Sequence, residues 1–121
     1  TSNICSNEGL LALSATITLS LIGKEGFKKM ADLSIAKTQY ALQALSKKSS
    51  VSLPFSGAVF NELTVDLKKG TAAEFIAKAK AKGIQPGVDV SKLGTKEKNR
   101  LLIAFTEKKS KEEIDALLEL F

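Results

Sequence analysis

The 121-residue sequence lacks histidine and tryptophan, and it contains one cysteine, Cys5, and one arginine, Arg100. Without histidine there can be no Ser-His-Asp or Cys-His nucleophile, no histidine-ligated zinc and no histidine acid–base catalysis. A single cysteine excludes an internal disulfide and any cysteine-rich metal site. We therefore expect no ordinary hydrolytic catalysis from this chain alone, and we assign no residue as catalytic or as a metal ligand.

Arginine is scarce even though the chain is basic, with 18 basic and 13 acidic residues, a net charge of +5 and a pI near 9.4. Recognition of phosphates and bases depends largely on arginine forks and stacked aromatic rings. Here aromatic residues make up only 6% of the chain, and the lysines are scattered along it among glutamates and aspartates. The composition favours a solvated surface, and we expect no nucleic-acid partner.

One long apolar run, residues 10–22, stands near the start of the chain. It is shorter than the roughly 20 residues that span a membrane, and no basic segment precedes it as in a secretory signal. Hydroxyl side chains interrupt it at Ser14, Thr16, Thr18 and Ser20. We therefore expect no membrane contact, and predict a helix that other protein surfaces cover on nearly all sides.

The ends of this first helix are also marked in the sequence. Ser6 and Asn7 are good N-cap residues, Glu8 would lie in the first turn, and Gly23 would be the C-cap. The chain has no initiator methionine, and a small domain would not normally open on so apolar a helix. We expect a C-terminal piece of a longer chain, with residues 1–23 as an interdomain helix region that could also form a homodimer.

Changes of hydrophobic period indicate the remaining elements. We predict an amphipathic helix over 24–46, strands at 51–55, 60–67 and 100–107, and helices at 71–83 and 110–121. A glycine-rich loop at 83–94 could hold a short edge strand. Thr71 with Glu74 and Ser110 with Glu113 form capping boxes at the last two helices. The apolar side of the 24–46 helix comprises Phe27, Met30, Ala31, Ser34, Thr38, Ala41, Leu42 and Leu45.

This order predicts a single α+β domain over residues 1–121. The sheet would be small and mainly antiparallel, with helices on one face, and a long apolar helix would precede it. The continuous apolar strand at 100–107 would be central in the sheet.

Three stretches resemble the P-protein of the glycine cleavage system, glycine decarboxylase, in its form split over two chains. They are "TSNICSNEGLLAL" at the start, "FNELTVDL" in the middle and "LLIAFTEKKSKEEIDALLELF" at the end. The match to the first subunit covers essentially the whole chain and is looser over residues 68–98. The resemblance implies the small C-terminal domain of the aspartate-aminotransferase-like pyridoxal phosphate fold, whose opening helix leaves a large domain.

The resemblance also implies a function for the whole enzyme. Glycine dehydrogenase (decarboxylating) is a pyridoxal phosphate enzyme that releases CO2 from glycine and passes the aminomethyl group to lipoylated H-protein. It would be cytoplasmic and would contain a second P-protein subunit. The lysine that binds the cofactor lies in that other subunit, so we expect this piece alone to hold no cofactor and to be inactive.

The resemblance implies few site residues in this chain. Thr1, Ser2 and Asn3 would contact the cofactor phosphate of a neighbouring subunit, although they also suit a plain polar loop with a helix cap. Some relatives bind the substrate carboxylate with an arginine on the last strand, and that position corresponds here to Leu102. Arg100 could share that face of the strand, but a surface arginine is the favoured interpretation.

Two other interpretations of the chain remain open at this point. The chain could be the small domain of another pyridoxal phosphate enzyme, of the desulfurase or aminotransferase type. It could instead be a non-catalytic module that binds an acidic partner, such as a lipoyl carrier protein, or RNA.

Overall fold

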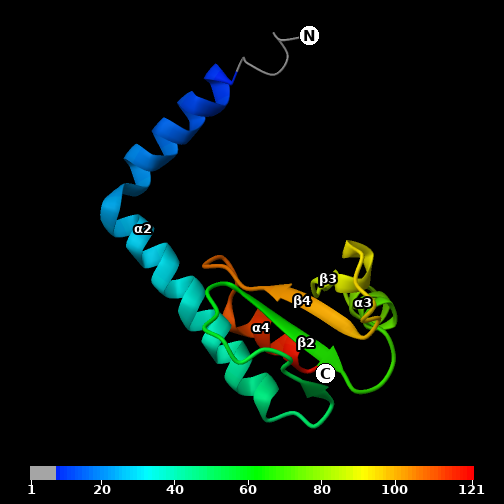
Figure 1. Cartoon of the computed structure of the whole chain (residues 1–121). Helices are drawn as coiled ribbons and strands as arrows, with labels where there is room; N and C mark the ends of the chain where they lie inside the picture. The colour runs from blue at the N-terminus through cyan, green and yellow to red at the C-terminus, as the bar shows by residue number, and fades with distance from the viewer. Residues whose placement is uncertain (1–7) are drawn as a thin grey trace, which may run out of the picture.

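The structure, a computed structural model, describes residues 8–121. The predicted caps Ser6 and Asn7, the predicted phosphate contacts Thr1, Ser2 and Asn3, and Cys5 lie outside this range. The elements, in chain order, are α2 (Gly9–Ser46), β1 (Val51–Ser52), β2 (Glu62–Leu67), α3 (Ala72–Lys80), β3 (Val88–Asp89), the 3-10 helix η1 (Val90–Leu93), β4 (Arg100–Ala104) and α4 (Lys111–Leu118). Figure 1 shows their arrangement.

The four strands form one antiparallel sheet in the order β1-β2-β4-β3. Strands β2 and β4 pair over their whole lengths, from Glu62 opposite Ala104 to Asp66 opposite Arg100. The prediction of a small antiparallel α+β domain with a central final strand is therefore confirmed. Strand β4 alternates between buried and open residues, however, so it is covered on one face only.

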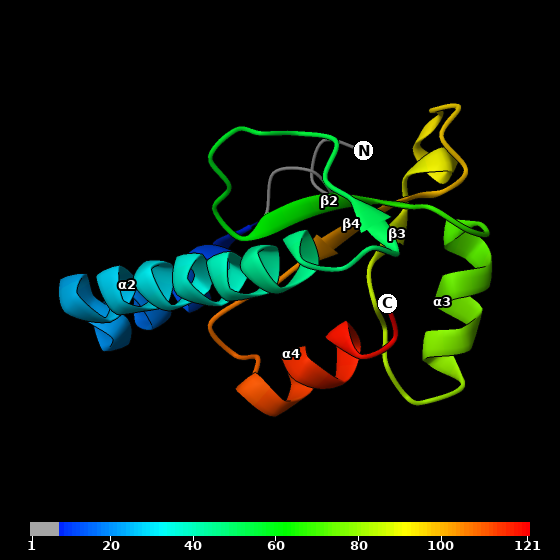
Figure 2. The same ribbon diagram turned by 90° about the horizontal axis from the view of Figure 1, so that it is seen from below.

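Figure 2 shows why one face of the sheet is buried. Helices α4, α3 and the C-terminal part of α2 lie on the same side, and the loop between β1 and β2 crosses the other. The core lies between the sheet and these helices, as predicted, and it removes apolar side chains from water. Its largest fully buried apolar side chains are Phe105, Leu45, Leu101, Ile103 and Val65.

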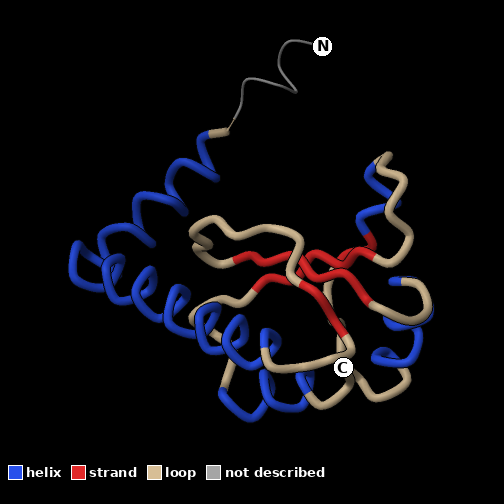
Figure 3. The backbone as a smooth tube through the Cα atoms, turned by 60° about the horizontal axis from the view of Figure 1, so that its bottom comes forward, coloured by secondary structure: helices blue, strands red, loops and turns tan. Residues whose placement is uncertain are grey.

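Helix α2 joins the two predicted N-terminal helices across a break at Gly23, whose φ of 62° and ψ of 179° are not helical. Glycine adopts this conformation readily because it has no Cβ. The chain therefore turns, and residues 9–22, the N-terminal arm, extend away from the sheet (Figures 1 and 3). Glu8 is the N-cap and not a first-turn residue, because its carbonyl accepts the hydrogen bond from the Ala12 N–H at 2.8 Å.

The second part of α2 packs on the domain through a narrow stripe. Ser34, Thr38, Ala41 and Leu45 are buried, and both hydroxyls donate to the carbonyl four residues earlier. Satisfied hydroxyls can be buried without a lost hydrogen bond. Phe27 was expected on the same side but is 43% exposed, because the buried part of the stripe begins only at Ser34.

Both predicted capping boxes are present, with Thr71 and Glu74 at α3 and Ser110 and Glu113 at α4. Strand β1 is shorter than predicted and ends at Ser52, and the ring of Phe55 is 66% exposed. Pro54 has no N–H for the ladder, so pairing with β2 cannot continue past it.

A substitution at Gly87 tests how closely the chain before β3 approaches β4. A Cβ at this position would lie 2.2 Å from the Leu102 carbonyl oxygen, and its φ of 145° disfavours other residues. We expect Gly87→Ala to lower the free energy of unfolding by roughly 1–3 kcal/mol, measured by urea denaturation. Gly57 has open space around it, so Gly57→Ala is the matched control. Equal stabilities of the two variants would contradict this packing.

Candidate functional site

The N-terminal arm is the most exposed apolar surface of the described chain. Leu10 and Leu21 are 80% and 82% exposed, and Leu11, Leu13, Ile17 and Leu19 are each more than half exposed. The hydroxyls of Thr16, Thr18 and Ser20 donate to carbonyls within the same helix, at 2.8 Å each. Because these polar groups are already satisfied, they do not oppose burial of the arm against another apolar surface.

By length and composition, one stretch of α2 is apolar enough to cross a membrane. Its mean hydropathy is 1.3 over 18 residues, none of which is buried. Core helices of soluble proteins and signal sequences meet the same criterion, so hydropathy alone does not show whether this stretch contacts a membrane or a protein. Our expectation of a protein contact stays a prediction.

The open face of the sheet carries one organised polar group, around Arg100. Its guanidinium donates to both carboxylate oxygens of Asp66, directly opposite on β2, at 2.7 and 2.8 Å. The exposed ring of Phe55 lies 5.5 Å from the guanidinium carbon, a cation–π distance. A bidentate pair of this kind fixes the orientation of both side chains.

The sequence left open whether Arg100 shares a strand face with Leu102 or is a surface arginine, and the structure shows its position. Arg100 and Leu102 do share the open face, as strand alternation predicted. The Arg100 side chain is only 21% exposed, and its guanidinium is already hydrogen-bonded to Asp66, which raises the pKa of Arg100 further. In the described chain it is a cross-strand structural residue.

The electrostatics of the described chain give no sign of an acid–base catalyst. Six charged side chains have shifted pKa values, and every shift favours the charged form. Catalytic acids and bases instead have pKa values moved toward the working pH. For example, bonds from Lys111 and Tyr40 lower the pKa of Asp115, and the Tyr40 bond ties α2 to α4.

Residues 8–121 also contain no metal-binding cluster and no buried lysine. All lysines of the sequence lie in this range and reach solvent, so none is desolvated as a cofactor-binding lysine would be. The hydroxyls at the starts of α3 and α4 are used in capping boxes. This part of the chain therefore does not fit pyridoxal phosphate.

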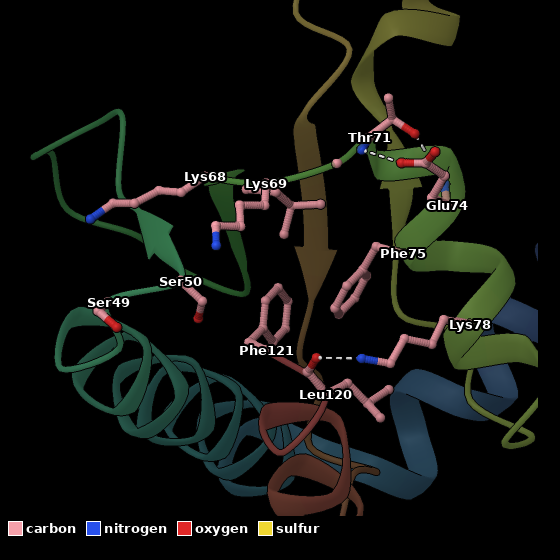
Figure 4. Close-up of a pocket in the computed structure, with 12 residues that line it drawn as sticks. Ser49, Ser50, Lys68, Lys69, Thr71, Glu74, Phe75, Lys78, Leu120 and Phe121 are labelled. Carbon is pink, nitrogen blue, oxygen red and sulfur yellow. Dashed lines mark hydrogen bonds between the residues drawn. The ribbon is translucent and has the colours of Figure 1, made fainter.

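A pocket of about 530 Å3 lies between the start of α3, the end of β2 and the end of the chain (Figure 4). Its apolar floor is the stacked pair Phe75 and Phe121, whose ring centroids are 4.3 Å apart. The sequence did not predict this pocket, because nothing in it indicated that these two rings meet.

Comparison with known proteins shows the family of this chain. The family model described as "Glycine cleavage system P-protein" matches residues 1–121. The chain belongs to this P-protein family. It is 43% identical over 119 residues to the probable glycine dehydrogenase (decarboxylating) subunit 1 of Geobacillus sp. and 44% identical to that of Chloroherpeton thalassium. Each match covers 98% of this chain but 26% of the relative, so the chain spans about a quarter of their length.

Two solved structures share the fold of this P-protein family member. One is an inhibitor-bound glycine decarboxylase (P-protein) of the glycine cleavage system, with a TM-score of 0.75, 24% identity, and coverage of 96% of this chain and 27% of that one. The other is a NifS-like protein from Rickettsia africae, with a TM-score of 0.64, 15% identity and coverage of 80% and 29%. The predicted fold assignment is confirmed.

The Asp66–Arg100 pair can be tested against an exposed pair on α2. The side chains of Lys28 and Asp32 are 70% and 59% exposed, whereas that of Asp66 is 20% exposed. We expect Asp66→Asn to lower the Tm by about 5 °C, because it removes a shielded bidentate bond. Asp32→Asn, the matched control, should lower it by less than about 2 °C. Equal losses of Tm in thermal denaturation would show that the Asp66–Arg100 pair contributes no more to stability than the exposed Lys28–Asp32 pair.

Proposed function

We propose that this chain is part of a glycine dehydrogenase (decarboxylating), the P-protein that decarboxylates glycine and transfers the aminomethyl group to lipoylated H-protein. The observation that supports this most strongly is the family match over residues 1–121, together with relatives that carry this enzyme name. Those names are qualified as probable and belong to chains about four times longer. The reaction therefore belongs to the whole enzyme, which we expect to be cytoplasmic.

Pyridoxal phosphate would bind outside residues 8–121 of this chain. The described residues offer no desolvated lysine and no free phosphate cradle to hold it. Thr1, Ser2 and Asn3 stay candidates for the phosphate of a neighbouring subunit, and the resemblance is their only support. When bound, the cofactor supplies the electron sink for decarboxylation.

The role that we propose for this piece is structural. The N-terminal arm would pack on the large domain of the enzyme or on a second P-protein subunit, since its apolar side chains are exposed and its hydroxyls are satisfied within the helix. A homodimer through the arm is the alternative when the piece is alone. The core of the domain would hold the open face of the sheet in place for further contacts.

A pyridoxal phosphate enzyme of the desulfurase or aminotransferase type is less well supported. The likeness to the NifS-like protein is one of fold, at 15% identity. The family match and the identities of 43% and 44% favour the P-protein.

We expect the 121-residue chain to be inactive by itself. Purified chain, lipoylated H-protein, pyridoxal phosphate and carboxyl-labelled glycine should release no labelled CO2 above a control without protein, because the described residues offer no desolvated lysine to hold the cofactor. The positive control is the complete two-subunit enzyme that contains this chain. Labelled CO2 from the isolated chain would contradict the structural role. An inactive complete enzyme would contradict the proposed reaction.

A further inference from the structure

Two segments of the chain are basic. Residues 24–48 contain six lysines and two acidic residues, a net charge of +4, and residues 68–98 contain eight lysines and three acidic residues, a net charge of +5. One of the three acids, Asp89, is buried and accepts hydrogen bonds from Ser91. The lysines are Lys68, Lys69, Lys78, Lys80, Lys82, Lys92, Lys96 and Lys98. The second of these segments makes the end of the fold that holds α3, β3 and η1 strongly basic (Figure 1).

The pocket over Phe75 and Phe121 opens at this basic end. In Figure 4 the amines of Lys69 and Lys78 lie on opposite sides of the two rings, and Lys68 extends away from them. The pocket therefore combines an apolar floor, formed by the stacked rings, with a cationic group on each side. This arrangement suits a ligand that has an apolar centre and negative charges around it.

The two cations at the pocket have no carboxylate partner among residues 8–121. Neither Lys69 nor Lys78 forms an ion pair there, and Lys78 makes only a long hydrogen bond of 3.4 Å to the Leu120 carbonyl. The acidic residue in the lining, Glu74, accepts the Thr71 N–H in its capping box. Both ammonium groups are therefore available to an acidic ligand.

We propose that this pocket docks an acidic protein segment that carries an apolar side chain. The side chain packs on Phe75 and Phe121, and carboxylates on either side of it pair with Lys69 and Lys78. An acidic segment fits better than a nucleic acid, because the pocket has no arginine to bind phosphate in a bidentate manner. The proposal does not depend on the catalytic function and is tested by binding alone.

The test is fluorescence anisotropy of a labelled heptapeptide with three glutamates on each side of one phenylalanine, titrated with the 121-residue chain. We expect saturable binding that weakens as salt rises from about 50 mM to about 500 mM, because partly exposed ion pairs are screened. A peptide with serine in place of the phenylalanine should bind about tenfold more weakly, because it loses the apolar contact.

Two double variants distinguish binding at the pocket from attraction by net charge. Lys69→Glu with Lys78→Glu should weaken binding at least about tenfold, since two attractive contacts become repulsive. The control is Lys24→Glu with Lys29→Glu, two exposed lysines of α2 that change the net charge by the same amount. This control should bind within about twofold of the unaltered chain. Circular dichroism should show the same fold for both double variants.

Three results would overturn the proposal. The first is equal weakening by both double variants, which would indicate attraction by net charge alone. The second is equal binding of the phenylalanine and serine peptides, which would exclude the aromatic floor. The third is a labelled single-stranded oligonucleotide that binds more tightly than the peptide and loses affinity in the Lys69 and Lys78 variant, which would make the pocket a nucleic-acid site.

Discussion

The pairing of β2 with β4 is the constraint on which the rest of the domain depends. The register that sets Asp66 opposite Arg100 turns one set of alternate residues of both strands toward the helices. A slip by one residue would turn Val65 and Leu101 outward and bring charged groups into the core. The Asp66–Arg100 bond holds this register at one end, and Gly87 allows the chain before β3 to approach β4.

Because the helices cover one side of the sheet, three surfaces of the chain stay open for other molecules. They are the N-terminal arm, the open face of the sheet and the basic pocket over Phe75 and Phe121. Within residues 8–121, none of them holds a buried lysine or a metal-binding cluster. A domain with a one-sided core and several open surfaces is suited to contacts with other molecules, and the chain spans about a quarter of the length of its P-protein relatives.

Local patterns in the sequence predicted much of this fold. The hydrophobic period, the capping boxes and Gly23 predicted the helices. Alternation predicted β2, and a continuous apolar run predicted the central position of β4. The exposure of Phe27 was missed because it depends on where α2 leaves the domain, which is a tertiary property, whereas the early end of β1 follows from Pro54, which cannot donate to the ladder. The Asp66–Arg100 bond and the Phe75–Phe121 floor join residues 34 and 46 positions apart, and one sequence does not show which of its distant residues meet. The predicted phosphate residues, Thr1 to Asn3, lie outside the described range.

Hydrogen exchange along the isolated chain tests the central claim, that the core excludes the N-terminal arm and leaves it for another surface. The amides of β2, β4 and α4 should exchange slowly, near the rate set by global unfolding. Those of residues 9–22 should exchange fast, because a short exposed helix is marginally stable in water. Protection of residues 9–22 equal to that of β2 and β4, at a concentration where the chain is monomeric, would show that the arm packs in its own core and would contradict the account.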